Sequence, residues 1–226
     1  MDRTYREWPE AGPVRSWEAA LPAGAAPFVQ RVVPDGCADL MWLDGGLVVA
    51  GPDTGPMPSL MRPGARVGGV RFGPGAASAV LGVPADALRD ARVPLRELWG
   101  AEADRLAERV AGAADRRIAL VTAVAARVRP VDPLDAAVVA GLARGTVRQV
   151  ADEVGLSERQ LRRRSLAAFG YGPKTLQRVL RFQRALGLAR AGVPLADVAY
   201  RAGYADQAHL ANEVRALGGA PIRALL

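Results

Sequence analysis

Two stretches near the end of the chain follow one pattern: 147-VRQVADEVGLSERQLRRR-164 and 195-LADVAYRAGYADQAHLANEVRAL-217. They align at an offset of 48 residues up to Gly155 and Gly203, and at an offset of 49 residues after these glycines. The second copy therefore has one more residue in the turn that follows its glycine. A repeat of this kind predicts two copies of one small helical unit.

The shared positions suit a helix-turn-helix, in which two short helices cross at a steep angle. Ala151 and Ala199 are small enough to lie where the two helices touch. The glycine four residues later can leave the first helix in a left-handed conformation at little cost. Ser157 and Asp206 can cap the second helix through their side-chain oxygens. The other apolar positions are predicted to form the two cores: Val150, Val154, Leu156 and Leu161 in the first unit, and Val198, Leu210, Val214 and Leu217 in the second.

A longer helix is predicted between the two units, from Pro173 to about Ala191. It begins with a proline, which is favourable in a first turn, and it stops at 192-GVP-194. Such a rod would hold the two second helices at a fixed separation. If both enter the major groove on one side of a duplex, they lie about 34 Å apart, which is one turn of DNA.

The basic residues of the chain gather in the same region. Residues 131–226 hold 13 arginines and one lysine against eight acidic residues, whereas residues 1–130 hold 16 arginines against 15 acidic residues. The formal net charge of +7 therefore comes almost entirely from the C-terminal part. Clustered positive charge predicts a polyanionic partner, with nucleic acid first and an anionic membrane surface second.

The C-terminal region resembles the AraC family of transcription activators, through the two repeats and the segment 170-GYGPKTLQRVLRFQRAL-186. This resemblance covers about residues 133–223 and implies a DNA-binding half with two helix-turn-helix units joined by a long helix. The N-terminal region is similar to the sensor half of one branch of these regulators, through 34-PDGCADLMW-42, 51-GPDTG-55 and 68-GGVRFGPGAA-77. The resemblance implies double-stranded DNA as a partner and a small-molecule effector. RNA polymerase and a second copy of the chain are the further partners it implies.

Three positions depart from the pattern of that family. Ser165 and Val214 stand where members usually have a phenylalanine, and Asn212 stands where a further arginine is expected. Losing a buried aromatic side chain costs about 3–5 kcal/mol if nothing compensates. Leu166 and Phe169 are the candidates to repack the first site. We therefore expect a DNA-binding half of lower stability than its relatives, or a second unit that reads DNA weakly.

One face of each second helix is predicted to meet DNA. In the first unit this face carries Ser157, Glu158, Arg159, Arg162 and Arg163, and in the second it carries Gln207, Ala208, Ala211 and Asn212. Arginine can donate two hydrogen bonds to guanine, while asparagine and glutamine suit adenine. Two interpretations of the arginines stay open, because they either read bases or only contact phosphates.

The connecting helix and the lone histidine each allow two interpretations. Arg178, Arg181 and Arg184 recur at a three-residue spacing, and they either neutralise phosphates or form ordinary ion pairs. His209 is expected to be a partly buried packing residue beside Leu210, with phosphate contact as the alternative.

The first 100 residues are rich in glycine and proline, which leaves room only for short elements. Strands are predicted over residues 28–33, 38–43, 47–51 and 67–72, with a hairpin turn at 44-DGG-46. Residues 101–111 and 114–128 carry apolar side chains at helical spacing and predict two helices joined at Gly112. Their apolar stripe (Leu106, Val110, Ile118, Val121, Val124 and Val128) either packs on the strands or serves as a dimer seam.

These patterns predict an α+β protein. A small β-barrel or sandwich, the expected ligand-sensing domain, occupies residues 1–100, and a helical hairpin occupies residues 101–130. An all-α DNA-binding domain occupies residues 131–226. The boundary falls at 129-RPVDP-133, because proline disfavours helix at the residue before it.

The N-terminal part could enclose a pocket for an apolar ligand. Its candidate lining residues are Trp17, Asp39, Met41, Trp42, Arg71 and Phe72, with Asp53 as a further polar group. The alternative is that the aromatic side chains are core and that Arg71 pairs with a nearby acid. Cys37 is either a redox or alkylation sensor or an inert packed thiol, since reactivity needs exposure and a lowered pKa.

Composition excludes several classes of function. One cysteine and one histidine exclude intrachain disulfides and metal sites built from several such residues, so we expect neither a metal nor a cofactor. No run approaches about 20 apolar residues, and the first residues lack a signal pattern, so we expect a cytoplasmic protein without a membrane span.

Three hypotheses for the function follow. The first is a DNA-binding transcription regulator that responds to a small molecule at its N-terminal domain. The second is a DNA-binding regulator that has lost ligand response and acts constitutively or through a protein partner. The third is an enzyme in the β-domain. The sequence contains no nucleophile–base pair, metal cluster or phosphate loop that would support it, so we expect no enzymatic activity.

Overall fold

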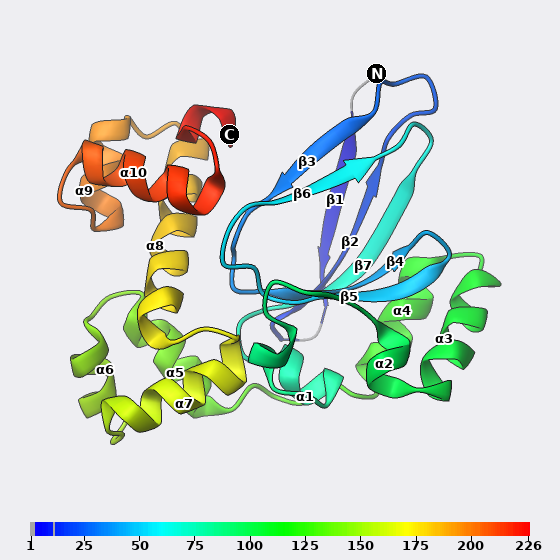
Figure 1. Cartoon of the computed structure of the whole chain (residues 1–226), viewed down its shortest axis with the longest axis horizontal. Coiled ribbons are helices and arrows are strands. Elements are labelled where there is room, and N and C mark those ends of the chain that lie inside the picture. Colours follow the sequence, from blue (N-terminus) through cyan, green and yellow to red (C-terminus); the bar gives the residue numbers. More distant parts are fainter. Residues whose placement is uncertain (1–2, 11) are drawn as a thin grey trace.

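A computed structural model describes residues 3–10 and 12–226 of the chain. The eight strands that the structure describes all lie in the N-terminal half, together with several helices, whereas the C-terminal half is helical, and the two halves lie side by side (Figure 1). No helix within the described residues is long and apolar enough to cross a membrane.

Six antiparallel strands form the main sheet of the N-terminal half. In spatial order these are β1 (Thr4–Pro9), β2 (Val14–Ala20), β7 (Arg66–Phe72), β4 (Ala38–Leu43), β5 (Gly46–Ala50) and β8 (Arg92–Pro94). Two more strands, β3 (Phe28–Val32) and β6 (Met57–Met61), pair only with each other in a ribbon.

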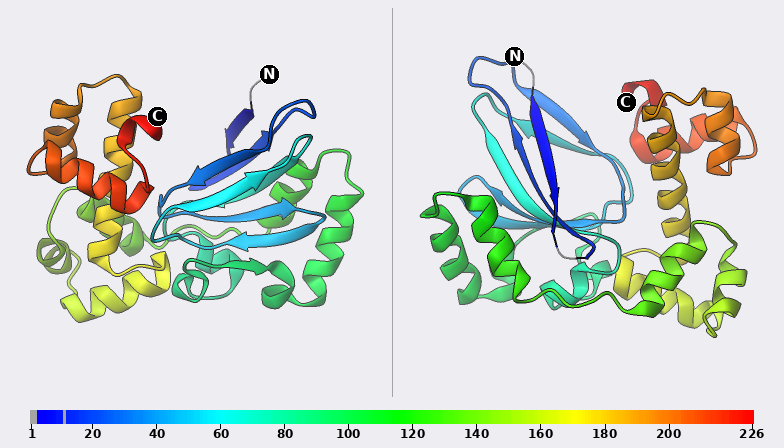
Figure 2. Two further views of the ribbon diagram at one scale, coloured as in Figure 1. Left: turned by 45° about the horizontal axis from the view of Figure 1, so that its top comes forward. Right: turned by 180° about the vertical axis from the view of Figure 1, so that it is seen from behind.

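The sheet does not close on itself, so the barrel alternative of the predicted fold is wrong for the described strands, while the α+β class is confirmed. The ribbon lies against one face of the sheet (Figure 2). Trp17, Ala19 and Leu21 form a small apolar cluster with Met61 of the ribbon. The result is an open sandwich, because β3 and β6 bond to each other and leave β1 and β8 as free edges.

The predicted hairpin joins β4 and β5. Leu43 pairs with Gly46, and the two residues between them have positive φ angles of 50° at Asp44 and 84° at Gly45. Both positive angles are what a two-residue hairpin of the favoured twist requires, and glycine adopts them freely.

Helices cover the other face of the sheet and enclose the main core. They are α1 (Ala77–Leu81), the 3₁₀ turn η1 (Ala85–Leu88), α2 (Leu95–Trp99), α3 (Ala101–Ala111) and α4 (Arg116–Ala125). Leu106 and Val110 of α3 and Val124 of α4 are buried in one cluster with strand residues. The predicted stripe thus packs on the strands, as the first of its two interpretations has it, and Ile118 stays 52% exposed.

The C-terminal half consists of six helices and a final turn. These are α5 (Pro133–Leu142), α6 (Val147–Glu153), α7 (Glu158–Phe169), α8 (Pro173–Arg190), α9 (Leu195–Ala202), α10 (Gln207–Gly218) and the 3₁₀ turn η2 (Ile222–Ala224). Helices α6 and α7 form the first helix-turn-helix and α9 and α10 the second, each with its own apolar core.

The local predictions for both units are confirmed. Ala151 and Ala199 are buried, and Gly155 and Gly203 have φ angles of 68° and 83°. Helices α7 and α10 lie at opposite ends of α8 and run in the same general direction in all three views (Figures 1 and 2). Recognition helices in adjacent turns of a groove need this arrangement.

The end of α7 is fastened to the N-terminal half. Four hydrogen bonds cross between the halves: Tyr171 Oη to the Asp53 carbonyl (2.6 Å), Arg89 Nη1 to the Gly170 carbonyl (3.2 Å), Ser78 Oγ to the Ala167 carbonyl (2.9 Å), and Gln183 Nε2 to the Pro34 carbonyl (2.6 Å). A Cβ at Gly170 would lie 2.5 Å from Cγ of Pro52. The two halves therefore meet in a close contact that tolerates no side chain at Gly170.

We predict that Gly170→Ala destabilises the protein more than Gly155→Ala. Both glycines have a positive φ, which costs other residues about 1–2 kcal/mol. Nothing lies within 4 Å of a Cβ at Gly155, whereas Gly170→Ala adds the clash with Pro52 and a further loss of about 1–3 kcal/mol. Urea unfolding of both variants measures the difference, and equal losses would contradict the close contact.

Candidate nucleic-acid interface

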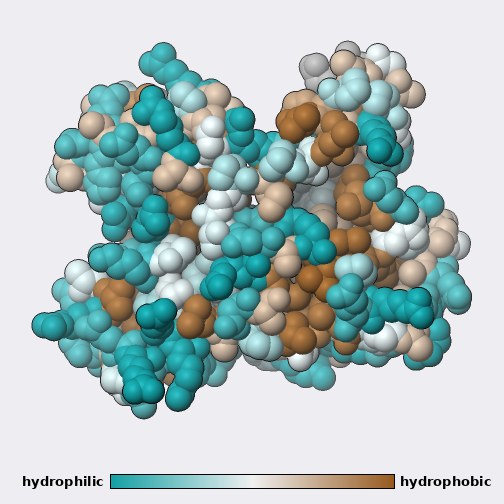
Figure 3. Space-filling model, viewed as in Figure 1, coloured by the Kyte–Doolittle hydropathy of each residue, from teal (hydrophilic) through white to brown (hydrophobic). Residues whose placement is uncertain are grey.

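Helix α7 starts at a capping box that fixes its exposed face. The Ser157 hydroxyl accepts from the Gln160 backbone N–H at 3.3 Å, and Gln160 Oε1 accepts from the Ser157 N–H at 2.9 Å. Leu161 is fully buried in the core of the first unit. Every residue of the first unit that is predicted to meet DNA is exposed on the remaining surface: Ser157, Glu158, Arg159, Arg162 and Arg163. Hydrophilic side chains gather at the lower left of Figure 3, where α6 and α7 lie.

Arg164 has a different task from the arginines beside it. Its guanidinium lies 2.6 Å from Asp132 and 2.6 Å from Asp135, at the start of α5. The hydrogen bond from Arg164 lowers the pKa of Asp132. This arginine therefore fixes α7 against α5, and its charge is compensated within the protein. No local sequence pattern predicts this role, because the two acidic residues are 29 and 32 residues away.

Helix α10 presents a shorter and less cationic face. The Asp206 carboxylate accepts from the His209 backbone N–H at 2.7 Å and caps the helix, as predicted. Gln207, Ala208 and Asn212 are exposed, and Ala211 is half-buried.

The prediction of a partly buried His209 is wrong. The residue is exposed, and its ring stands edge-on to Tyr204 with the centroids 5.2 Å apart. It lies in the first turn of α10, beyond the part of the core that Leu210 reaches.

The arginines of α8 differ in their surroundings. Arg178 makes two hydrogen bonds to the Glu213 carboxylate, at 2.9 and 3.0 Å, which is the ion-pair interpretation for this residue. The hydrogen bond from Arg178 lowers the pKa of Glu213. The guanidinium of Arg181 lies over the ring of Tyr204 at 5.5 Å from its centroid, and Arg184 is exposed.

The six residues predicted to line one ligand pocket lie on opposite faces of the sheet, so a single pocket formed by all six is not present. Trp42 and Phe72 belong to the core beneath the helices. The four others, Trp17, Asp39, Met41 and Arg71, face the β3–β6 ribbon. Side chains alternate along a strand, so neighbours such as Met41 and Trp42 must point in opposite directions. Asp53, the further polar candidate, is paired with Arg92 at 2.7 Å.

Four polar side chains, Trp17, Asp35, Asp39 and Arg71, form a network on the ribbon side. Asp39 accepts from Trp17 Nε1 at 2.7 Å and from Arg71 Nε at 3.1 Å, and its side chain is only 13% exposed. A second carboxylate, Asp35, lies 3.4 Å from Arg71 Nη1. Burial raises the pKa of Asp39, although Arg71 opposes this shift. Burial also disfavours the charge on Arg71, but the two carboxylates outweigh it and raise the pKa of the guanidinium.

Cys37 lies beside this network without being activated by it. Burial, followed by the Asp35 carboxylate, raises the pKa of the thiol well above its usual value. A protonated thiol is a poor nucleophile. These surroundings favour the inert-thiol interpretation.

Two family models match parts of the chain. A helix-turn-helix domain matches residues 150–226, which include α7, α8, α9 and α10. The C-terminal part of this chain is an AraC-type helix-turn-helix domain. A domain of unknown function (DUF6597) matches residues 14–94, which hold seven of the eight strands.

Solved structures similar to this chain include several of ToxT from Vibrio cholerae. An apo ToxT variant is 10% identical, with a TM-score of 0.48 over 96% of this chain and 97% of that one. ToxT with a bound unsaturated fatty acid is 10% identical, with a TM-score of 0.48 over 99% and 94% of the two chains. A third ToxT structure is 11% identical, with a TM-score of 0.46 over 98% and 96%. No curated protein matches the sequence.

The AraC-type domain accommodates the absence of the two expected phenylalanines, at Ser165 and Val214, by different means. Phe169 fills the first core together with Tyr171, while the predicted Leu166 stays at its margin, half-buried. Val214 is fully buried in the second core. Ser165 is 0% exposed, and its hydroxyl has no hydrogen-bond partner. An unpaired buried hydroxyl costs free energy that an apolar side chain does not.

We predict that Ser165→Ala stabilises the AraC-type domain. Removing the unpaired hydroxyl should gain about 1 kcal/mol, and alanine is also the better helix former. The melting temperature should rise by about 2–4 °C for a chain of this size. Ser157→Ala is the matched control, because its hydroxyl makes the cap of α7 and its loss costs about 1 kcal/mol. A lower melting temperature for Ser165→Ala would contradict the assignment.

Proposed function

We propose that the protein is a sequence-specific DNA-binding transcription regulator of the AraC type, controlled by a small molecule at its N-terminal half. In this proposal residues 1–100 sense the ligand, residues 101–130 join the halves or contribute to a dimer, and residues 131–226 bind double-stranded DNA. RNA polymerase and a second copy of the chain are the further partners proposed, and the site of action is the cytoplasm. No catalytic role is assigned.

Uncompensated charge on α7 is the observation that carries DNA binding. Within the described residues, Arg159, Arg162 and Arg163 take part in no ion pair, although their neighbour Arg164 has two. Three free guanidinium groups on the exposed side of a capped helix repel one another, and a polyanion removes that repulsion. Arginine also has the donor geometry that reads guanine.

The two units are proposed to contribute unequally. The face of α10 carries Gln207, Ala208 and Asn212, without a cation among them, so it suits adenine and the thymine methyl group. Most of the salt-dependent affinity is therefore assigned to α7. This assignment agrees with asparagine at position 212, where the resemblance to the AraC family leads us to expect arginine.

The N-terminal half has a direct route by which a ligand would act on the DNA-binding half. Arg71 contacts Asp35, and the carbonyl of the preceding residue, Pro34, accepts a hydrogen bond from Gln183 of α8. A ligand that binds the Arg71 guanidinium would compete with Asp35 and displace the loop that touches α8. Such a ligand shifts the arrangement of the halves only if it prefers one arrangement over the other.

We predict that Arg162→Ala and Arg163→Ala each weaken DNA binding about tenfold. Fluorescence anisotropy on duplexes selected from a random library, at several salt concentrations, measures the effect. An arginine that reads a base lowers the affinity for selected more than for random duplex, whereas one that contacts phosphate lowers both and reduces the salt slope by about one. Arg105→Ala on α3 removes the same charge elsewhere and should change nothing. Absence of binding at low salt would overturn the function.

We also predict that a ligand of the ribbon-side network raises the melting temperature through mass action. A compound at 100 times its Kd stabilises the protein by about 2.7 kcal/mol. A screen of cellular metabolites by thermal shift should find such a compound, and Arg71→Gln should abolish its effect while Arg105→Gln keeps it. If no compound raises the melting temperature, ligand control is wrong and the regulator acts without it or through a protein partner.

A further inference from the structure

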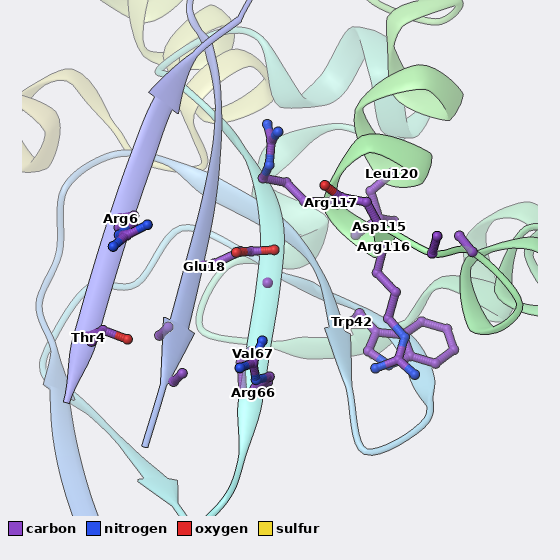
Figure 4. Close-up of a pocket in the computed structure, with 15 residues that line it drawn as sticks. Thr4, Arg6, Glu18, Trp42, Arg66, Val67, Asp115, Arg116, Arg117 and Leu120 are labelled. Carbon is purple, nitrogen blue, oxygen red and sulfur yellow. The ribbon is translucent and has the colours of Figure 1, made fainter. Parts of the chain in front are cut away.

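The helix side of the main sheet is not fully covered, and the uncovered part forms a hollow of about 710 Å³. It lies between strands β1, β2 and β7 on one side and the start of α4 on the other (Figure 4). We call it the arginine hollow, because Arg6, Arg66, Arg116 and Arg117 line it.

Strand register explains why there is space here. One row across four strands reads Arg6, Glu18, Gly68 and Trp42, and the next row reads Thr4, Ala20 and Arg66. Gly68 and Ala20 lie at the centre of these rows and offer almost no side chain. The centre of this part of the sheet therefore carries almost no side chains, while longer side chains surround it and form the walls of the hollow.

The first turn of the covering helix α4 borders the hollow. On the other side of the first row lies a row with Ser16, Val70 and Leu40, all fully buried beneath the helices. Helix α4 begins at Arg116, and Arg116, Arg117 and Leu120 of its first turns form one wall of the hollow. Arg117 reaches back to Ser16 at 3.0 Å and to Glu10 at 3.3 Å, so it fastens the helix to the sheet and is not free for a ligand.

The other three arginines have no carboxylate partner among the residues that the structure describes. Arg6 and Arg66 rise from the strands, and Arg116 lies over the indole of Trp42 at 5.5 Å from its centroid (Figure 4). The two acidic residues of the hollow are Glu18 and Asp115, and the Asp115 carboxylate is occupied as the cap of α4, accepting from the Ile118 N–H at 3.0 Å. Positive charge is therefore in excess around a floor with small side chains at its centre.

We propose that the arginine hollow binds a small organic anion. Its carboxylate or phosphate group would accept hydrogen bonds from Arg66, Arg6 and Arg116, and its flat apolar body would lie over Gly68 beside Trp42. Arginine suits both kinds of anion, because its donors match their paired oxygens. The hollow also has the volume of a small-molecule site. It opens on the opposite side of the sheet from Asp39 and Arg71, so the inference stands whether or not the ribbon-side network binds an effector.

Calorimetric titration of the full chain tests the proposal with three probes that share one body: naphthoate, naphthyl phosphate and the neutral naphthalenemethanol. At least one of the two anions should bind with a Kd below about 1 mM, and the neutral probe should bind at least about tenfold more weakly. Arg66→Gln and Arg116→Gln should each weaken the anion about tenfold. Arg105→Gln, which removes the same charge from α3, should leave the affinity unchanged.

An occluding variant separates this hollow from the other face of the sheet. Gly68 has no positive φ, and a Cβ there would lie 3.3 Å from the nearest atom, so Gly68→Leu fills the hollow with only a small adjustment of the strand. Circular dichroism checks that the variant remains folded, and the glutamine variants serve if it does not. Loss of binding in Gly68→Leu and in the glutamine variants supports the site. Equal binding of charged and neutral probes, unchanged binding in the glutamine variants, or no binding of either anion would overturn it.

Discussion

One helix sets the geometry of the whole C-terminal half, because the buried side of α8 is shared between two cores. Leu176 and Val179 belong to the core of the first unit, and Phe182 and Leu186, one to two turns later, belong to the core of the second. Side chains advance by about 100° per residue around a helix, so the rotation between the two units is fixed by which residues of α8 are apolar. Neither unit can turn about this axis without exposing its own core.

Helix α8 also connects the DNA-binding half to the N-terminal half, through the contact between the two halves. Gly170 and Tyr171 link α7 to α8, and both residues are bonded to the N-terminal half. The first recognition helix and the rod are thus held at their common corner by the part of the chain that carries the Asp39–Arg71 network. A few hydrogen bonds and close contacts at this corner therefore connect the half proposed to sense a ligand with the half proposed to bind DNA.

Sequence patterns predicted the C-terminal half well and the N-terminal half in part, for a physical reason. The turn glycines, the capping residues and the apolar positions of the two units act over a few residues, so their pattern is visible locally. The strands β1, β2, β6 and β8 were missed. All four are short and contain or adjoin a proline, and β2, β6 and β8 also depend on the partners β7, β3 and β5, which are not their neighbours in the sequence. Of the two capping boxes, at Thr146 with Gln149 and at Ser157 with Gln160, only the Ser157 cap was predicted, although the Thr-x-x-Gln and Ser-x-x-Gln spacing is present in the sequence.

The candidate sites show the same division. The exposed residues of α7 could be predicted once Leu161 was placed in the core, because helical periodicity then fixes the direction of every other side chain. The arginine hollow could not be predicted, because it depends on the register that brings Arg6, Gly68 and Trp42 into one row. The opposite directions of Met41 and Trp42 follow from strand alternation, and that rule was available from the sequence but was not applied to the predicted pocket.

When the hydrogen bond from Gln183 to the Pro34 carbonyl is released, the corner at Gly170 and Tyr171 makes α8 a lever with its pivot at one end. The helix has 18 residues and is therefore about 27 Å long. A tilt of only about 5° at the pivot would carry the far end, with α10, sideways by about 2 Å, close to two thirds of the 3.4 Å rise between base pairs. Small angular changes at the sensor would thus leave the first half-site in register and shift the second.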